Sequence, residues 1–159
     1  MSTYFGIDWG ETSHELCISN AKGERIIGQA LPHSRKGFEM IEQFRKQLGL
    51  SAKECVIGIE TAHTTLIDWL WEQGYEQIYV LPPHMVEKSR SRFRQSGSKD
   101  DPIDAYEISD LLRTSRHRLL PWQPGSMLLQ QLRATSSWHL ALTKQSVAQS
   151  NRLRSLLLR

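Results

Sequence analysis

Four carboxylates occur at places where the sequence predicts that one secondary-structure element ends and another begins. Asp8 and Glu60 each follow an apolar segment of strand length. Asp101 and Asp104 lie three residues apart at a predicted helix start, so both side chains project from the same face of that helix. Carboxylates that lie close together repel one another unless cations neutralise them, and hard divalent ions such as Mg²⁺ take oxygen ligands. The four residues are therefore candidate ligands of Mg²⁺, with Mn²⁺ as a substitute.

A carboxylate site of this kind indicates phosphodiester chemistry. Two bound ions about 4 Å apart can activate the attacking oxygen and stabilise the leaving oxygen. Each acid also has a purely structural interpretation. Asp101 and Asp104 can stabilise an ordinary helix start, whereas Glu60 can face water at a strand end and Asp8 can form a turn. The enzyme hypothesis rests on the four acids taken together.

The elements that must position these acids can be predicted from hydrophobic patterning. Apolar residues in 4–9, 14–19 and 25–31 are separated by short polar turns, which is typical of an antiparallel meander. Residues 55–59 form a continuous apolar run, as in a central strand that is covered on both faces. The other predicted elements are helices over 36–48 and 64–73, a strand over 78–81, a helix through the basic segment and a helix from 101. This order predicts an α/β fold.

Strand direction decides whether the first two acids can act together. If the strands that end at Asp8 and Glu60 are parallel neighbours, both acids project from the carboxyl end of the sheet, where open α/β sheets bind ligands. The helix from Asp101 would then have to cover the same end. We therefore expect one site built from three separate parts of the chain.

The distribution of charge predicts a nucleic-acid partner. Residues 1–85 carry 7 bases and 11 acids, whereas residues 86–159 carry 13 bases and 6 acids. Because contacts of Lys and Arg with phosphates supply most non-specific affinity for nucleic acids, we expect the basic half to bind DNA or RNA. The candidate contact residues are Lys88, Arg90, Arg92, Arg94 and Lys99.

The last part of the chain is expected to form one long helix. No Pro follows position 124, no Gly follows position 125, and leucines recur on roughly one stripe. Such a helix extends beyond what a small domain can cover, so part of it should pair with another helix in a homo-oligomer. The chain also stops within an apolar turn, which indicates a fragment of a longer protein.

Several other classes of protein are not expected. No apolar run approaches the roughly 20 residues that cross a bilayer, so a soluble cytoplasmic protein without a membrane partner is the default. Cys17 and Cys55 have no second thiol or histidine at metal-binding spacing. Buried reduced thiols are therefore favoured over a disulfide or a zinc site.

Three motifs resemble those of a known family. They are Phe5-Gly6-Ile7-Asp8, Ile57-Gly58-Ile59-Glu60-Thr61 and Lys99-Asp100-Asp101-Pro102-Ile103-Asp104-Ala105. Together they are similar to the Asp-Glu-Asp-Asp signature of insertion-sequence transposases related to the Piv-type invertases. The resemblance implies a ribonuclease-H-like fold of the Holliday-junction-resolvase type, with a mixed five-stranded sheet flanked by helices. This catalytic domain would span residues 1–118, and residues 119–159 would begin a helical coiled-coil segment.

The resemblance also implies an activity and its partners. Asp8, Glu60, Asp101 and Asp104 would bind Mg²⁺ and position the scissile phosphate of DNA. Members of the family recombine DNA with the help of a structured guide RNA, so DNA, guide RNA and further copies of the chain are the implied partners, at the nucleoid of a bacterial or archaeal cell. The serine nucleophile of the family belongs to a separate domain that no segment of this chain matches. The chain alone is therefore expected not to complete strand exchange.

Two other interpretations stay open at this point. A non-catalytic nucleic-acid-binding module would keep the fold and the basic helix, while the acids only cap helices and face solvent. The segment 6–12 also resembles the first phosphate loop of actin-like ATPases and sugar kinases. That interpretation requires a second lobe with another phosphate loop, for which 159 residues leave no room. Divalent-ion binding distinguishes the enzyme from the module, and tight ATP binding would support the third interpretation.

Overall fold

The computed structural model of this protein describes residues 2–10, 13–60, 64–93 and 101–157. The chain forms two compact units, Met1–Gln123 and Pro124–Arg159. The first unit contains the sheet and the four candidate ligands, and the second contains one long helix.

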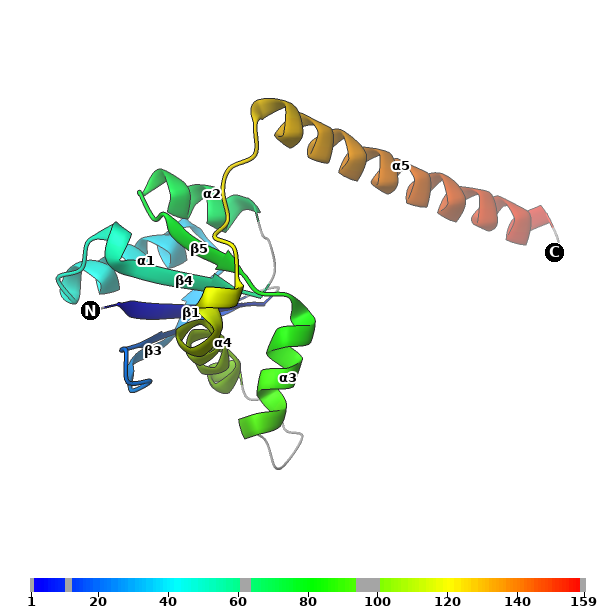
Figure 1. The fold of residues 1–159 in the computed structure, drawn as a ribbon. Coiled ribbons are helices and arrows are strands. Elements are labelled where there is room, and N and C mark those ends of the chain that lie inside the picture. Colours follow the sequence, from blue (N-terminus) through cyan, green and yellow to red (C-terminus); the bar gives the residue numbers. More distant parts are fainter. Residues whose placement is uncertain (1, 11–12, 61–63, 94–100, 158–159) are drawn as a thin grey trace. The chain divides into compact units, whose positions relative to one another are not determined.

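The strands of the first unit form a five-stranded sheet in the order β3-β2-β1-β4-β5 (Figure 1). Their bounds are β1 (Thr3–Trp9), β2 (Ser13–Ser19), β3 (Arg25–Pro32), β4 (Cys55–Ile59) and β5 (Gln77–Val80). β2 pairs antiparallel with β1 and β3, whereas β4 pairs parallel with β1 and β5. The predicted meander is confirmed, and β1 and β4 are the parallel neighbours that a shared site of Asp8 and Glu60 requires. The mixed five-stranded sheet that the resemblance implied is therefore present.

Helices cover both faces of the sheet (Figure 1). They are α1 (Arg35–Gln47), α2 (Thr64–Glu72), α3 (Pro83–Phe93) and α4 (Asp101–Ser115), with the short 3₁₀ helices η1 (Ala52–Glu54) and η2 (Arg116–Arg118). One core cluster joins the sheet to α1 and α2, and a second joins it to α3 and α4. α4 makes its most extensive packing contacts with β1 and β2.

β4 shows why a continuous apolar run was needed at the centre of the sheet. All five of its residues are buried. Ile57 and Ile59 belong to the cluster beneath α1 and α2, whereas Val56 belongs to the cluster beneath α4. Because successive side chains point to opposite faces, a strand covered on both sides must be apolar at every position.

Both cysteines are buried free thiols, as the sequence predicted. Burial raises the pKa of the Cys17 thiol, and it raises the pKa of Cys55 to about 12. The thiolate is the nucleophilic form of cysteine, and these thiols stay protonated at neutral pH. Neither cysteine is therefore suited to nucleophilic catalysis.

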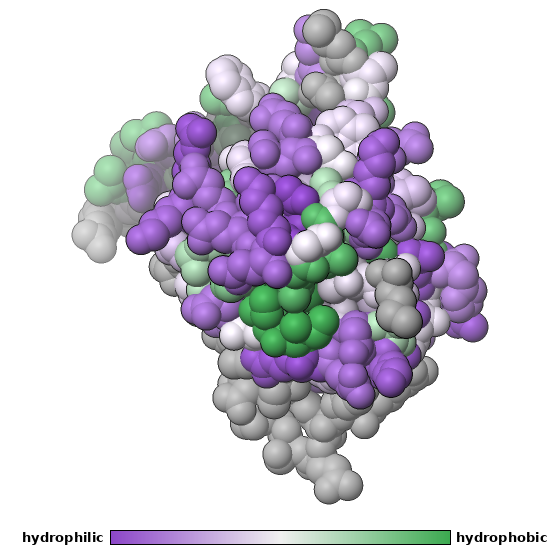
Figure 2. Space-filling view, turned by 90° about the vertical axis from the view of Figure 1, so that its left-hand side faces the viewer, coloured by the Kyte–Doolittle hydropathy of each residue, from purple (hydrophilic) through white to green (hydrophobic). Residues whose placement is uncertain are grey.

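The first unit uses most of its large apolar side chains in its core. Among its described residues, the exposed large hydrophobic side chains are those of Ile26 and Leu120. On the face drawn in Figure 2, hydrophilic residues predominate and surround one smaller hydrophobic area. A mostly polar surface of this kind is compatible with an ionic partner.

The second unit contains α5 (Met127–Leu157), which confirms the single long helix. Its leucines are exposed along the helix, at Leu128, Leu129, Leu132, Leu140, Leu142, Leu153, Leu156 and Leu157. No helix within the described ranges is long and apolar enough to cross a bilayer.

Candidate active site

The two central parallel strands bring Asp8 and Glu60 to the same edge of the sheet. β1 and β4 pair with Gly6 opposite Gly58 and with Ile7 opposite Ile59. Asp8 and Glu60 are the next residues along these two segments, and both are partly buried. Neighbouring parallel strands in this register carry the two acids side by side at their carboxyl ends.

The two glycines show which face of the sheet these acids share. A Cβ atom on Gly6 would lie 2.1 Å from the carbonyl oxygen of Ala105, and one on Gly58 would lie 2.5 Å from Leu112. Both glycines therefore face α4. Because side chains alternate along a strand, Asp8 and Glu60 lie on this same face two residues later.

α4 runs along this face in the direction opposite to β1. Near the start of β1, Tyr4 packs in one cluster with Leu111 and Leu112. Further along β1, Gly6 approaches Ala105 and Ser109, which come earlier in α4. The amino-terminal turns of α4 therefore lie towards the end of β1 that carries Asp8.

Asp104 is a described carboxylate of α4 towards this end of the sheet. Its side chain is only 5% exposed, and it directly precedes Ala105, whose carbonyl contacts β1. Asp101 is the first residue of α4, one turn earlier, but its side chain lies outside the described part of the structure. The structure thus brings Asp8, Glu60 and Asp104 to one end of one sheet face.

The described side chains alone do not form a complete metal centre. Among them, no group of three or more His, Cys, Asp or Glu residues has the geometry to hold an ion. All four candidate ligands offer only oxygen donors, which suits Mg²⁺ or Mn²⁺ and not a soft metal. The residues present therefore fit a hard divalent ion.

Two further acids lie close to these candidates and were not recognised in the sequence. Glu15 of β2 is directly opposite Asp8 in the antiparallel register, so it shares the face of Asp8. Glu107 of α4 is fully buried one turn after Asp104. Glu107 follows Asp104 by three residues, and this spacing places both on one face of a helix, so the sequence did indicate Glu107. Glu15 could be found only from the register in which β1 and β2 pair.

The opposite face of the same strand end carries an aromatic cluster that sequence analysis also missed. The ring of Trp9 stacks on that of His14 with centroids 3.6 Å apart. His33 Nδ1 lies 3.0 Å from His14 Nε2, so one ring donates a hydrogen bond to the other. Trp9 alternates with Asp8, so this cluster packs behind the carboxylates and supports the strand that carries Asp8.

The basic segment forms α3, as predicted, although most of its side chains lie outside the described set. Lys88 is exposed on this helix. Arg90 and Arg92 belong to the helix, but the structure does not describe their side chains. Arg94 and Lys99 lie outside the described residues.

Comparison with known proteins identifies the family. The model of the DEDD transposases of the IS110 type, described as Transposase, matches residues 5–159. The chain belongs to the IS110-type DEDD transposase family. This membership favours the transposase interpretation over an ATP-binding lobe.

Two curated relatives of this IS110-type chain are themselves described as putative transposases. The chain is 29% identical over 113 residues to the putative transposase y4uE of Sinorhizobium fredii, which covers 70% of this chain and 31% of the relative. It is 28% identical over 160 residues to the mini-circle putative transposase for IS117 of Streptomyces coelicolor, covering 99% of this chain and 38% of the relative. The chain thus spans about a third of the length of these relatives.

Solved structures similar to this IS110-type chain include two of RuvC from Thermus thermophilus. One, a complex with a Holliday junction substrate, has 12% sequence identity and a TM-score of 0.48, and the match covers 77% of this chain and 100% of RuvC. The other has 13% identity and a TM-score of 0.47, covering 76% and 99%.

Proposed function

We propose that this chain is the amino-terminal domain of a DNA transposase that binds divalent ions and supports phosphodiester cleavage. The observation that carries the proposal is the placement of Asp8, Glu60 and Asp104. Asp8 and Glu60 end adjacent parallel strands on the face that α4 covers, and the buried Asp104 lies in the part of α4 that extends towards them. Acids are costly to bury near one another unless a cation neutralises them.

Asp8, Glu60, Asp101 and Asp104 would hold Mg²⁺, or Mn²⁺ in its place. When bound, the ions would supply activation of the attacking oxygen and stabilisation of the leaving oxygen at a phosphate. The chain's own contribution is to fix its carboxylates before the substrate arrives. Asp8 and Glu60 are held by strand pairing, and Asp104 is held by the close contact of α4 with β1.

The basic residues would hold the nucleic acid. Lys88, Arg90, Arg92, Arg94 and Lys99 would contact phosphates of DNA and of a structured guide RNA. The excess of bases in residues 86–159 supports this role. Since the chain spans about a third of its curated relatives, strand exchange would also require the remainder of the protein, including its serine nucleophile.

The second unit would connect copies of the protein. The exposed leucines of α5 lie on a helix that offers few apolar partners within its own unit, and burial of leucines between paired helices drives coiled-coil assembly. We therefore propose that the predicted coiled-coil segment 119–159 forms a dimer or tetramer through its helix α5. The assembly would act on DNA in the cytoplasm, at the nucleoid.

Substitution of Asp104 tests the metal site. We expect Asp104→Asn to raise the Kd for Mn²⁺ at least about tenfold, because a charged oxygen ligand is lost. Asp68→Asn, on the exposed surface of α2, removes the same charge elsewhere and should leave the Kd unchanged. Calorimetric titration measures both values, and near-UV circular dichroism verifies the fold. Equal affinities in the two variants would leave only a non-catalytic nucleic-acid-binding module.

A further inference from the structure

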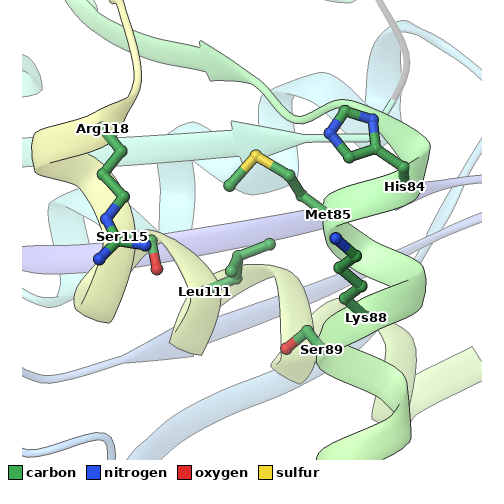
Figure 3. A pocket seen from close by; sticks show the side chains of 7 residues that line it. All are labelled: His84, Met85, Lys88, Ser89, Leu111, Ser115 and Arg118. Atoms are coloured by element: carbon green, nitrogen blue, oxygen red, sulfur yellow. The ribbon is translucent and has the colours of Figure 1, made fainter.

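A cationic groove separates α3 from the carboxyl-terminal part of α4. It has a volume of about 240 Å³ and lies wholly within the first unit (Figure 3). The side chains that line it come from α3, from α4 and from η2. They are His84, Met85, Lys88, Ser89, Leu111, Ser115 and Arg118.

The side chains that line the groove are suited to bind a phosphate group of a nucleic-acid backbone. Lys88 from α3 and Arg118 from η2 approach from opposite sides (Figure 3). Ser89 and Ser115 add hydroxyl donors, and no carboxylate occurs among the described lining residues. Two cations and two hydroxyls facing one space favour a phosphodiester over a neutral ligand.

The wall that carries Arg118 is fixed to the sheet. Arg116 Nη1 donates a hydrogen bond to Gln77 Oε1 at 3.1 Å. After η2, the backbone N–H of Trp122 donates to the carbonyl oxygen of Ile78 at 2.6 Å. These bonds tie η2 to β5 from both sides of Arg118. This wall of the groove is therefore in place before a ligand binds, which lowers the entropic cost of binding.

The groove begins beside the candidate active site. β5 runs parallel to β4, so α3 starts at the same edge of the sheet as Glu60. The backbone N–H of Leu81 donates to the carbonyl oxygen of Ile59 at 2.8 Å, directly before Glu60. His84 follows Leu81 by three residues and lines the groove. A nucleic-acid strand in the groove can thus continue towards the carboxylates.

We propose that this groove binds a backbone phosphate of the DNA strand that is cleaved. This inference rests on the proposed function and adds Arg118, Ser89 and Ser115 to the DNA contacts. Lys88 and Arg118 neutralise the phosphate. Met85 and Leu111 provide an apolar contact for the carbon atoms of the deoxyribose.

The dependence of DNA affinity on salt tests the groove. The variant carries Lys88→Gln with Arg118→Gln, and its control carries Lys22→Gln with Lys36→Gln, which removes the same charge from exposed positions on other elements. The Kd for a duplex DNA is measured at several salt concentrations in EDTA, so that no ion occupies the carboxylates. In the groove variant the magnitude of the slope of log K against log salt should fall by roughly 0.9, which corresponds to the loss of one phosphate contact. The control variant should keep the slope of the unchanged protein.

The remaining variants and substrates also test whether DNA binds in the groove. Arg118→Lys keeps the charge and should retain most of the slope of log K against log salt. Both Lys88 and Arg118 are exposed, so the fold is expected to persist in all of these variants. Equal slopes for the groove variant and its control would overturn the inference. A loss confined to RNA of the same sequence would overturn it as well. The groove variant could lower the salt slope as expected while Asp104→Asn binds Mn²⁺ as tightly as the unchanged protein. That combination would overturn the proposed function and would still support DNA binding in the groove.

Discussion

Asp8→Asn is expected to lower Mn²⁺- or Mg²⁺-dependent nicking of DNA by at least about a thousandfold. Bound ions supply several kcal/mol of transition-state stabilisation, and each 1.36 kcal/mol corresponds to about a factor of ten in rate. Asp8 lies at the end of β1 between Glu15 and the strand that leads to Glu60. Its replacement by Asn keeps the size of the side chain and removes the charge, so the sheet should persist.

The measurement is conversion of a supercoiled plasmid to its nicked form by the protein. Asp68→Asn is again the matched control, because it removes one carboxylate from an exposed helix surface. DNA affinity in EDTA should be equal in both variants. Nicking by Asp8→Asn at the rate of the unchanged protein would show that Asp8 is not a metal ligand.

Gly6→Ala should destabilise the fold by about 3 kcal/mol or more, at the upper end of what overpacking usually costs. The added Cβ would lie 2.1 Å from the carbonyl oxygen of Ala105 and 2.6 Å from the backbone nitrogen of Ser109. Both atoms belong to the backbone of α4, so the contact can be relieved only if the helix moves away from β1. Because Asp104 precedes Ala105, this movement should also weaken ion binding.

Gly49→Ala is the control for the addition of one methyl group. Gly49 has a φ of +66° and no neighbouring atom within 4 Å of the added Cβ. Its only cost is the left-handed conformation, about 1–2 kcal/mol. Urea unfolding gives both free energies of unfolding. Similar values for the two variants would contradict the close packing of α4 on β1.

Local patterning was enough to predict most elements of the first unit. The run 55–59 became β4 because both faces of that strand are covered, and the meander followed from short polar turns. The last strand was predicted one residue late, as 78–81, whereas β5 is Gln77–Val80. The N–H of Leu81 still donates to the carbonyl oxygen of Ile59 on β4, and α3 begins two residues later at Pro83.

The sequence predicts the proximity of site residues only where they lie close together in the sequence. Asp101 and Asp104 share a helix, so their proximity is local, but the meeting of Asp8 with Glu60 depended on strand order. That order places β4 beside β1 although some 50 residues separate them, and hydrophobic patterning carries no information about which strands become neighbours. Glu15 was missed for the same reason, because its position depends on the hairpin register.

The groove between α3 and η2 illustrates the same limit. Lys88 was recognised because it begins a dense basic segment. Arg118 has no such local signal, since it is one of several scattered bases after Asp110. Hydrogen bonds that tie Arg116 and Trp122 to β5 hold the segment that carries Arg118 across from α3, and the sequence carries no sign of these bonds.

The most direct test of the metal site is a crystal structure of the chain soaked with Mn²⁺, measured by anomalous diffraction. We predict an anomalous peak within about 2.5 Å of carboxylate oxygens of Asp8 and Glu60, with Asp101 or Asp104 as a further ligand. An absence of any peak at this end of the sheet under saturating Mn²⁺, with the four carboxylates ordered, would contradict the account.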